Sequence, residues 1–162
     1  MNPTYHSLGN HTEAIQIEFA PDEISFADII DMIWSSHNPI GAPRSSQYKS
    51  AIWFADDQQL STIKESVEPL VEKYERELTT EILPLETFFN AEDYHQKYVL
   101  QRHDAVLKQF NTYYPNFNDF VDSTAAARLN GFAYGCGSKA MFQEEQTSYG
   151  LTPEMLAPVF RS

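Results

Sequence analysis

The chain has 162 residues, a formal net charge of −12, a single cysteine (Cys136) and many aromatic residues, so its composition favours a folded domain with a real core. The negative charge argues against nucleic acid or an anionic membrane as a partner. One cysteine excludes a disulfide within the chain, and neither a signal peptide nor a membrane-spanning run is visible, which favours an intracellular, cytoplasmic protein.

The first predicted element is a strand over residues 13–21, whose sequence EAIQIEFAP alternates apolar and polar residues and ends at a proline. Its apolar positions would share one buried face. A helix is expected over residues 25–38, where Ser25 and Asp28 resemble a capping box in front of apolar residues at helical spacing. The pattern therefore places an amphipathic helix directly after a half-buried strand.

Two further strands and a long helix complete the first half of the chain. Residues 48–55 (YKSAIWFA) hold a continuous apolar run, which is typical of a strand covered on both faces. A helix is expected from about Asp57 to Leu78, and Pro69 should kink or split it. Residues 79–85 (TTEILPL) form the last predicted strand. This alternation of strand and helix favours a sheet with helical crossovers.

The second half of the sequence is predicted to be helical. Residues 91–110 read mostly as helix, and a second helix begins near residue 120 and ends at the glycines of residues 135–137. Ser138 can cap the next helix, and Thr152 followed by a proline starts a last short one. We therefore expect a helical C-terminal extension over residues 101–162.

Two polar stretches and one tyrosine could carry chemistry. In residues 2–13 (NPTYHSLGNHTE), Glu13 stands at the start of the first strand, where partial burial would let its carboxyl keep a proton and donate it, and Tyr5 could donate to the same acceptor. From the residues alone, a solvated Glu13 and a surface tyrosine is the favoured interpretation. Tyr48 opens the second strand and could reach a cleft there, or could simply pack at a strand end.

The second stretch is FFNAEDYHQKY, residues 88–98, in which His95 could be a base, a ligand or a structural donor. No second His or Cys stands four residues from His95, so we predict no metal site. Cys136 lies between two glycines. It is either a reactive thiol on an approachable backbone or a small residue at a helix break, and both interpretations stay open.

Taken together, four segments resemble the peptide methionine sulfoxide reductase A family, in the family's order and over roughly residues 2–100. They are NPTY with GNHTEAIQIEFAPDEISFADIIDMIWSSHNP, then SQYKSAIWF, TEILPLETFF and NAEDYHQKY. The resemblance implies an α+β fold, a two-layer sandwich with a mixed sheet of ferredoxin-like type. It also implies reduction of the S epimer of methionine sulfoxide, in proteins or free, with no bound cofactor and thioredoxin as the external reductant.

The resemblance assigns roles to the candidate residues. Glu13 resembles the family's acid, which protonates the sulfoxide oxygen, and Tyr5 and Tyr48 resemble the phenols that bind the same oxygen. Tyr98, with Asp93, His95 and Gln96 nearby, falls in the segment that lines and supports the substrate site. Such an acid makes chemical sense, because sulfoxide oxygen is a poor leaving group until it is protonated.

The sequence departs from the family in one essential respect. The family's nucleophilic cysteine lies in a G-C-F-W motif upstream of NPTY, and no such motif occurs in these 162 residues. We therefore expect residues 1–100 to be a partial reductase domain, N-terminally incomplete and part of a longer enzyme. Two alternatives remain: a non-catalytic relative that binds oxidised methionine or a protein partner, and an enzyme in which Cys136 is the nucleophile and Glu13 the acid.

Overall fold

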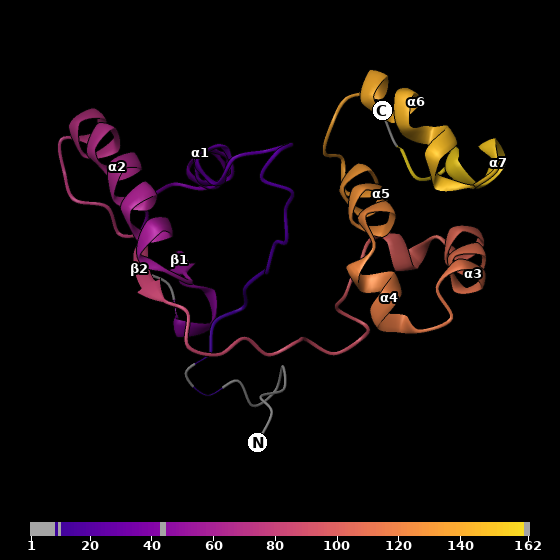
Figure 1. Ribbon diagram of the computed structural model, residues 1–162, viewed down its shortest axis with the longest axis horizontal. Coiled ribbons are helices and arrows are strands. Elements are labelled where there is room, and N and C mark those ends of the chain that lie inside the picture. Colours follow the sequence, from indigo (N-terminus) through magenta and orange to yellow (C-terminus); the bar gives the residue numbers. More distant parts are fainter. Residues whose placement is uncertain (1–8, 10, 43–44, 161–162) are drawn as a thin grey trace. The chain divides into compact units, whose positions relative to one another are not determined.

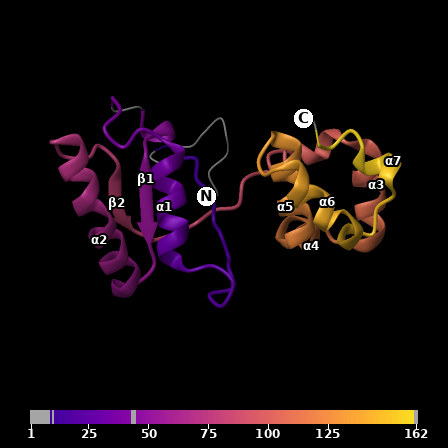
Figure 2. The same cartoon turned by 90° about the horizontal axis from the view of Figure 1, so that it is seen from above.

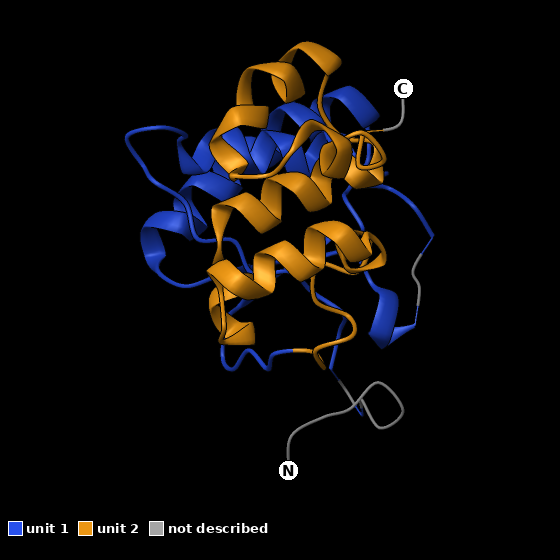
Figure 3. Cartoon of the chain, turned by 90° about the vertical axis from the view of Figure 1, so that its right-hand side faces the viewer, with its two compact units in different colours: residues 1–90 blue, residues 91–162 orange. Residues whose placement is uncertain are grey.

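The computed structural model describes residues 9, 11–42 and 45–160. The protein is α+β, as the sequence predicts, and is mostly helical with one small sheet (Figure 1). It divides into two compact units, Met1–Asn90 (unit 1) and Ala91–Ser162 (unit 2) (Figure 3). Among the helices of the described residues, none is both long enough and apolar enough to cross a bilayer.

Unit 1 combines a two-stranded sheet with two helices (Figure 2). Its main elements in chain order are α1 (Phe26–Ser36), β1 (Ala51–Phe54), α2 (Asp57–Tyr74) and β2 (Glu81–Pro84). The strands β1 and β2 are parallel, with Ile52 aligned with Ile82 in the register. Since α2 connects them, the predicted crossover between parallel strands is confirmed.

One apolar cluster holds unit 1 together. Its buried members are Ile30 and Trp34 from α1, Ile52 from β1 and Ile63 from α2. Trp34 also donates a hydrogen bond from Nε1 to Ser66 Oγ at 2.8 Å, so its one polar atom is satisfied at the junction of the two helices. Burial of each large apolar side chain contributes roughly 1.5–3 kcal/mol, so this cluster fixes the helices on the sheet.

The start of α1 and the course of α2 follow from local chemistry. Ser25 Oγ accepts from the Asp28 backbone N–H at 3.1 Å, and the Asp28 carboxylate accepts from the Ser25 N–H at 3.2 Å, so the predicted capping box is confirmed. A hydrogen bond that Ser25 Oγ donates to Asp28 Oδ2 at 2.5 Å, together with the one from the Ser25 N–H, lowers the pKa of Asp28. Helix α2 runs through Pro69 unsplit, but it ends at Tyr74, because Glu75 takes a left-handed conformation.

The predicted strand over residues 13–21 is wrong. The segment has no strand pairing, and Ile15 and Ile17, which should face a core, are 84% and 51% exposed. A strand needs a neighbour for its backbone N–H and C=O groups, and within the described residues only β1 and β2 pair. The described sheet is therefore a parallel pair, without the mixed character implied by the family resemblance.

All the regular secondary structure in the described part of unit 2 is helical. Its elements are η2 (Leu100–Arg102), α3 (Asp104–Tyr113), α4 (Phe117–Asp122), α5 (Thr124–Tyr134), α6 (Lys139–Glu145), η3 (Gln146–Tyr149) and α7 (Pro153–Leu156). Each contributes at least one buried side chain to a single core, in which Phe110 packs edge-on against Phe120 and Phe132 against Phe142. The predicted helical character of this half is thus confirmed.

Several helix boundaries in unit 2 differ from the sequence expectation. The helix expected over residues 91–110 begins only at Asp104. The next one is interrupted at Ser123, whose hydroxyl caps α5 by accepting from the Ala126 N–H at 3.1 Å. The predicted caps at Ser138 and Thr152 are confirmed.

Candidate functional site

Two segments that are far apart in the sequence come together in unit 1. Glu13 donates its backbone N–H to the Gln47 carbonyl at 2.9 Å, and Gln47 Nε2 donates to Glu13 Oε1 at 2.9 Å. One residue earlier, Thr12 Oγ1 donates to the Ser46 carbonyl at 2.7 Å. Since Gln47 is followed directly by Tyr48, two of the predicted catalytic residues occupy one neighbourhood.

A short 3-10 turn, η1 (Ser46–Tyr48), ends at Tyr48, and Lys49 and Ser50 separate it from β1. Tyr48 is therefore not the first residue of a strand, and its side chain is 46% exposed. Glu13 is exposed as well, which agrees with the solvated carboxyl that the residues alone favour and not with the alternative of partial burial at a strand mouth. The reason is the same as for Ile15: no paired strand forms there to cover the carboxyl. Tyr5 lies outside the described residues.

Gln47 is the residue that sequence reasoning missed. Its backbone and side chain both bond to Glu13, so it fixes the position of the carboxylate and leaves the second oxygen, Oε2, to face other groups. The only sequence signal was its place beside Tyr48 in SQYKSAIWF. A second link to this region comes from Phe89, whose ring meets the ring of His11 edge-on at 5.2 Å.

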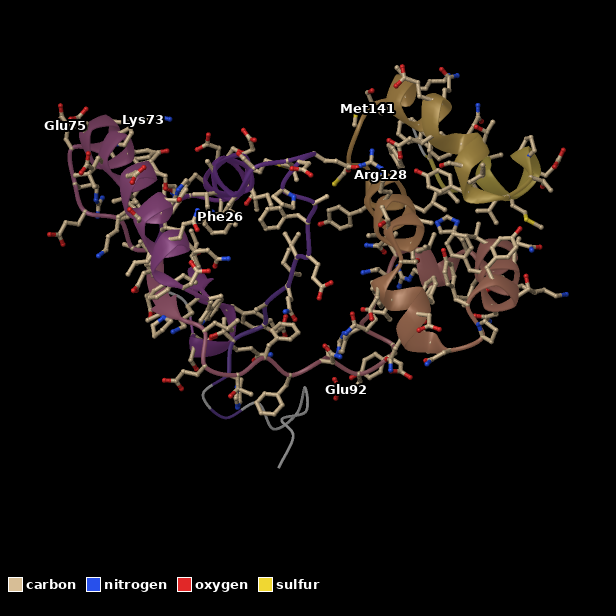
Figure 4. All side chains as sticks on the ribbon, viewed as in Figure 1. Phe26, Lys73, Glu75, Glu92, Arg128 and Met141 are labelled. Carbon is tan, nitrogen blue, oxygen red and sulfur yellow. The ribbon has the colours of Figure 1, made fainter. Side chains whose placement is uncertain are left out.

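The segment that carries Asp93, His95 and Tyr98 belongs to unit 2 and forms turns instead of the expected helix. The His95 N–H bonds to the Glu92 carbonyl at 2.8 Å, and the Gln96 N–H bonds to the Asp93 carbonyl at 3.2 Å. Figure 4 marks Glu92 on this segment. The imidazole of His95 is half-buried and lies against the Tyr94 ring, with centroids 4.1 Å apart.

Tyr98 is tied to a neighbouring arginine. Its hydroxyl oxygen accepts from Arg102 Nη2 at 2.9 Å, and the guanidinium lies over the phenol ring, 4.6 Å from its centroid. Because the arginine only donates, the Tyr98 O–H keeps its own proton for another acceptor. The side chain is 49% exposed, so a ligand can reach it.

Cys136 lies in unit 2, in the turn between α5 and α6. The Cys136 N–H bonds to the Gly131 carbonyl at 2.8 Å, and the Gly135 N–H bonds to the Phe132 carbonyl at 3.0 Å, which is the Schellman arrangement of a helix C-terminus. The cysteine is exposed. Glu13 and Tyr48 belong to unit 1, so a nucleophilic role for Cys136 beside them stays a prediction.

An ion pair joins the helices on either side of this turn. Arg128 on α5, labelled in Figure 4, forms a bidentate pair with Glu145 at the end of α6. Tyr149 donates its hydroxyl proton to Glu145 Oε2 at 2.5 Å. The hydrogen bond from Arg128 lowers the pKa of Glu145, and burial raises the pKa of Tyr149.

Other kinds of site in the described part of the chain do not involve the candidate residues. No group of three or more His, Cys, Asp and Glu side chains there could hold a metal ion. A cavity of 420 Å³ lies in unit 2, and none of the described candidate residues lines it. Its lining consists of Val99, Arg102, His103, Asp104, Ala105, Val106, Ala133, Met155 and Pro158.

Comparisons with known proteins agree on one family. A family model described as peptide methionine sulfoxide reductase matches residues 1–128. A peptide methionine sulfoxide reductase of Drosophila melanogaster is 36% identical, over 93% of this chain and 61% of its own length. Peptide methionine sulfoxide reductase MsrA of Pasteurella multocida is 35% identical, over 62% of this chain and 63% of its own length.

The extent of these matches bears on the helical extension. The Drosophila match covers 93% of the chain, so it includes most of residues 101–162. Peptide methionine sulfoxide reductase A2 of Arabidopsis thaliana is 35% identical, over 62% of this chain and 50% of its own length. The chain thus spans between 50% and 63% of the length of these three relatives.

Proposed function

Because the chain belongs to the peptide methionine sulfoxide reductase family, we propose that it takes part in reducing the S epimer of methionine sulfoxide to methionine, in proteins or free. The observation that carries the proposal is the pair of bonds between Glu13 and Gln47, which brings an acid next to the turn that ends in Tyr48. A carboxylic acid and a phenol that both reach a sulfoxide oxygen can bind and protonate it.

In the proposed reaction, Tyr5 and Tyr48 donate hydrogen bonds to the sulfoxide oxygen while Glu13 delivers a proton to it. A thiol sulfur attacks the sulfoxide sulfur, the sulfur–oxygen bond breaks, and the oxygen passes to the thiol as a sulfenic acid, leaving methionine. A second thiol, supplied ultimately by thioredoxin, converts the sulfenic acid to a disulfide and releases water. From the family resemblance, we expect Asp93, His95 and Tyr98 to line and support the substrate site.

The attacking thiol in this scheme comes from a G-C-F-W segment outside these residues. The same segment would complete a ferredoxin-like sandwich with a mixed sheet around residues 1–100 and would cover the exposed apolar face of Ile15 and Ile17. If this segment also covered Glu13, it would exclude water there and strengthen the hydrogen bond between Glu13 and the sulfoxide oxygen. A reducing cytoplasm suits this thiol chemistry and the single cysteine of the chain.

Peptide titration tests the proposal directly. The purified chain is titrated with three otherwise identical peptides that contain the S sulfoxide, the R sulfoxide or methionine, and binding is followed by calorimetry. We expect the S epimer to bind most tightly. Tyr48→Phe and Glu13→Ala should each weaken that binding about 2- to 10-fold, because each removes one hydrogen bond of about 0.5–1.5 kcal/mol. The exposed Glu18→Ala is the matched control and should change nothing.

Equal affinity for the three peptides would refute the proposal, and so would unchanged binding in both variants. The second candidate function, a non-catalytic relative that binds oxidised methionine or a protein partner, is favoured by the exposure of Glu13 and by the single cysteine. Turnover of the S sulfoxide by this chain with a dithiol reductant would exclude it. If Cys136→Ser then kept full turnover, Cys136 would not be the nucleophile.

A further inference from the structure

The segment that contains Asp93, His95 and Tyr98 is linked to helix α5 through the amide side chain of Asn130. Asn130 on α5 accepts two backbone hydrogen bonds at Oδ1, from the Val99 N–H at 3.2 Å and from the Leu100 N–H at 3.1 Å. Val99 follows Tyr98 directly. We propose that Asn130 is a positioning residue, which holds the Asp93–Tyr98 segment in its turn conformation; its relevance to substrate rests on the proposed function.

The backbone conformation explains why this acceptor is needed. If the segment were helical, as its sequence suggests, the amides of Val99 and Leu100 would bond to the carbonyls of His95 and Gln96. Lys97 instead takes a left-handed conformation with φ 48°, which breaks the helix at that point. The Gln96 carbonyl accepts from the Gln101 side chain instead. Asn130 therefore supplies the acceptor that the broken helix has lost.

Burial makes the loss of this acceptor costly. Leu100 is 0% exposed and belongs to the core of unit 2 together with Leu129, the residue before Asn130. A backbone N–H next to such a position has little water to bond to, so it needs a partner within the protein. One oxygen with two lone pairs serves both amides, which is within the capacity of an Asn side chain.

Two more interactions fix the same segment. Gln101 Nε2 donates to the Asp93 carbonyl at 2.7 Å, which closes the segment on itself. Lys97 is half-buried, which lowers its pKa, while the negative charge of Asp122 on α4 acts on it in the opposite sense. Helix α5 therefore bonds to the segment through Asn130, whereas Asp122 on α4 acts on Lys97 through its charge. Of these ties, only the one from Asn130 bonds directly to the backbone beside Tyr98.

The test measures amide hydrogen exchange in the full chain, for wild type, Asn130→Ala, Asn130→Asp and the control Asn111→Ala, which changes an exposed amide on α3. Asn130→Ala should speed exchange at Val99 and Leu100 at least tenfold and also in the turns from Asp93 onward, with the α3 amides still protected. Asn130→Asp keeps an oxygen acceptor and should restore protection. The control should match wild type.

Two results would overturn the inference. One is unchanged exchange at Val99 and Leu100 in Asn130→Ala. The other is a loss of protection throughout α3–α5 that is equal in the Ala and Asp variants, since that would mark a merely structural defect. Because exchange is measured without substrate, its result can be interpreted even if the proposed function is wrong.

A second readout connects the positioning role to substrate. In the peptide titration, Asn130→Ala should weaken binding of the S sulfoxide peptide about 2- to 10-fold, and Asn130→Asp should recover it. Unaltered affinity in Asn130→Ala, despite faster exchange in the segment, would overturn the positioning role. If the wild-type chain binds no sulfoxide peptide, the proposed function is refuted, while the exchange pattern still decides whether Asn130 holds the segment.

Discussion

Leu100→Ala should destabilise unit 2 strongly. Leu100 is 0% exposed and packs in the core of this unit immediately after the Asp93–Tyr98 segment. Truncation of a fully buried leucine removes its transfer free energy and leaves a cavity, which together cost about 2–5 kcal/mol. Unit 2 has roughly 70 residues, so at about 0.05–0.15 kcal/mol per residue its total stability is about 4–11 kcal/mol. The substitution should therefore remove about a fifth of that stability or more.

The free energy of opening of unit 2 is measured by native-state hydrogen exchange of the α3 and α5 amides at increasing urea concentration. Met141→Ala is the matched control, because Met141 lies on α6 and is 43% exposed, and it should change the opening free energy by less than about 0.5 kcal/mol. A loss below about 1 kcal/mol for Leu100→Ala would refute the assignment of Leu100 to a close-packed core.

Four more substitutions test separate parts of the structure. The hydrogen bond from the Arg128 guanidinium lowers the pKa of Glu145, so the stabilising contribution of this carboxylate is present above pH 4.5 and is lost as the pH falls through the folded-state pKa. Glu145→Gln should therefore flatten the acid limb of a plot of unfolding free energy against pH. An unchanged limb would contradict this. Gly137→Ala should cost unit 2 about 2–4 kcal/mol in urea unfolding, because φ is +79° and the new Cβ would lie 2.7 Å from the Phe132 ring. Gly135→Ala has φ +99° and no atom within 4 Å, so it should cost only about 1–2 kcal/mol, and equal losses would show that the contact with Phe132 is unimportant. Ile15→Ser should change the thermal stability of unit 1 by less than about 0.5 kcal/mol, whereas a loss above about 1.5 kcal/mol would mean that Ile15 is buried after all.

Helix starts were predictable because they depend on neighbouring residues alone. Ser25 with Asp28, Ser138 and Thr152 each satisfy free N–H groups within one turn, so the sequence contains the whole interaction. The end of α5 at Gly135 is local for the same reason.

The sequence alone could not decide whether residues 13–21 form a strand, because strand pairing depends on a partner that is distant in sequence. Alternation of Ile15 and Ile17 shows only that a strand would have one apolar face. It does not show that a neighbouring strand is present. Likewise, the helix expected through Asp93–Tyr98 gives way to turns, since Lys97 turns left-handed and Asn130, some 30 residues away, accepts the freed amides.

The candidate site was predicted through the family resemblance more than through local chemistry. From the residues alone, a solvated Glu13 was favoured, and the structure does expose it. The bonds that join Glu13 to Gln47 span 34 positions, so no local pattern could indicate that Glu13 and Tyr48 share one neighbourhood. The domain boundary expected at residue 100 stays a prediction, although the contacts divide the chain between Asn90 and Ala91.

The central claim is that the Glu13–Tyr48 neighbourhood binds a sulfoxide oxygen. Nuclear magnetic resonance of the labelled chain, titrated with the S and R epimers of a methionine sulfoxide peptide, tests it most directly. We expect shifts concentrated at the backbone amides of Glu13, Gln47 and Tyr48, larger for the S epimer than for the R epimer and absent with methionine. Shifts that avoid these residues, or that are equal for both epimers and for methionine, would contradict it.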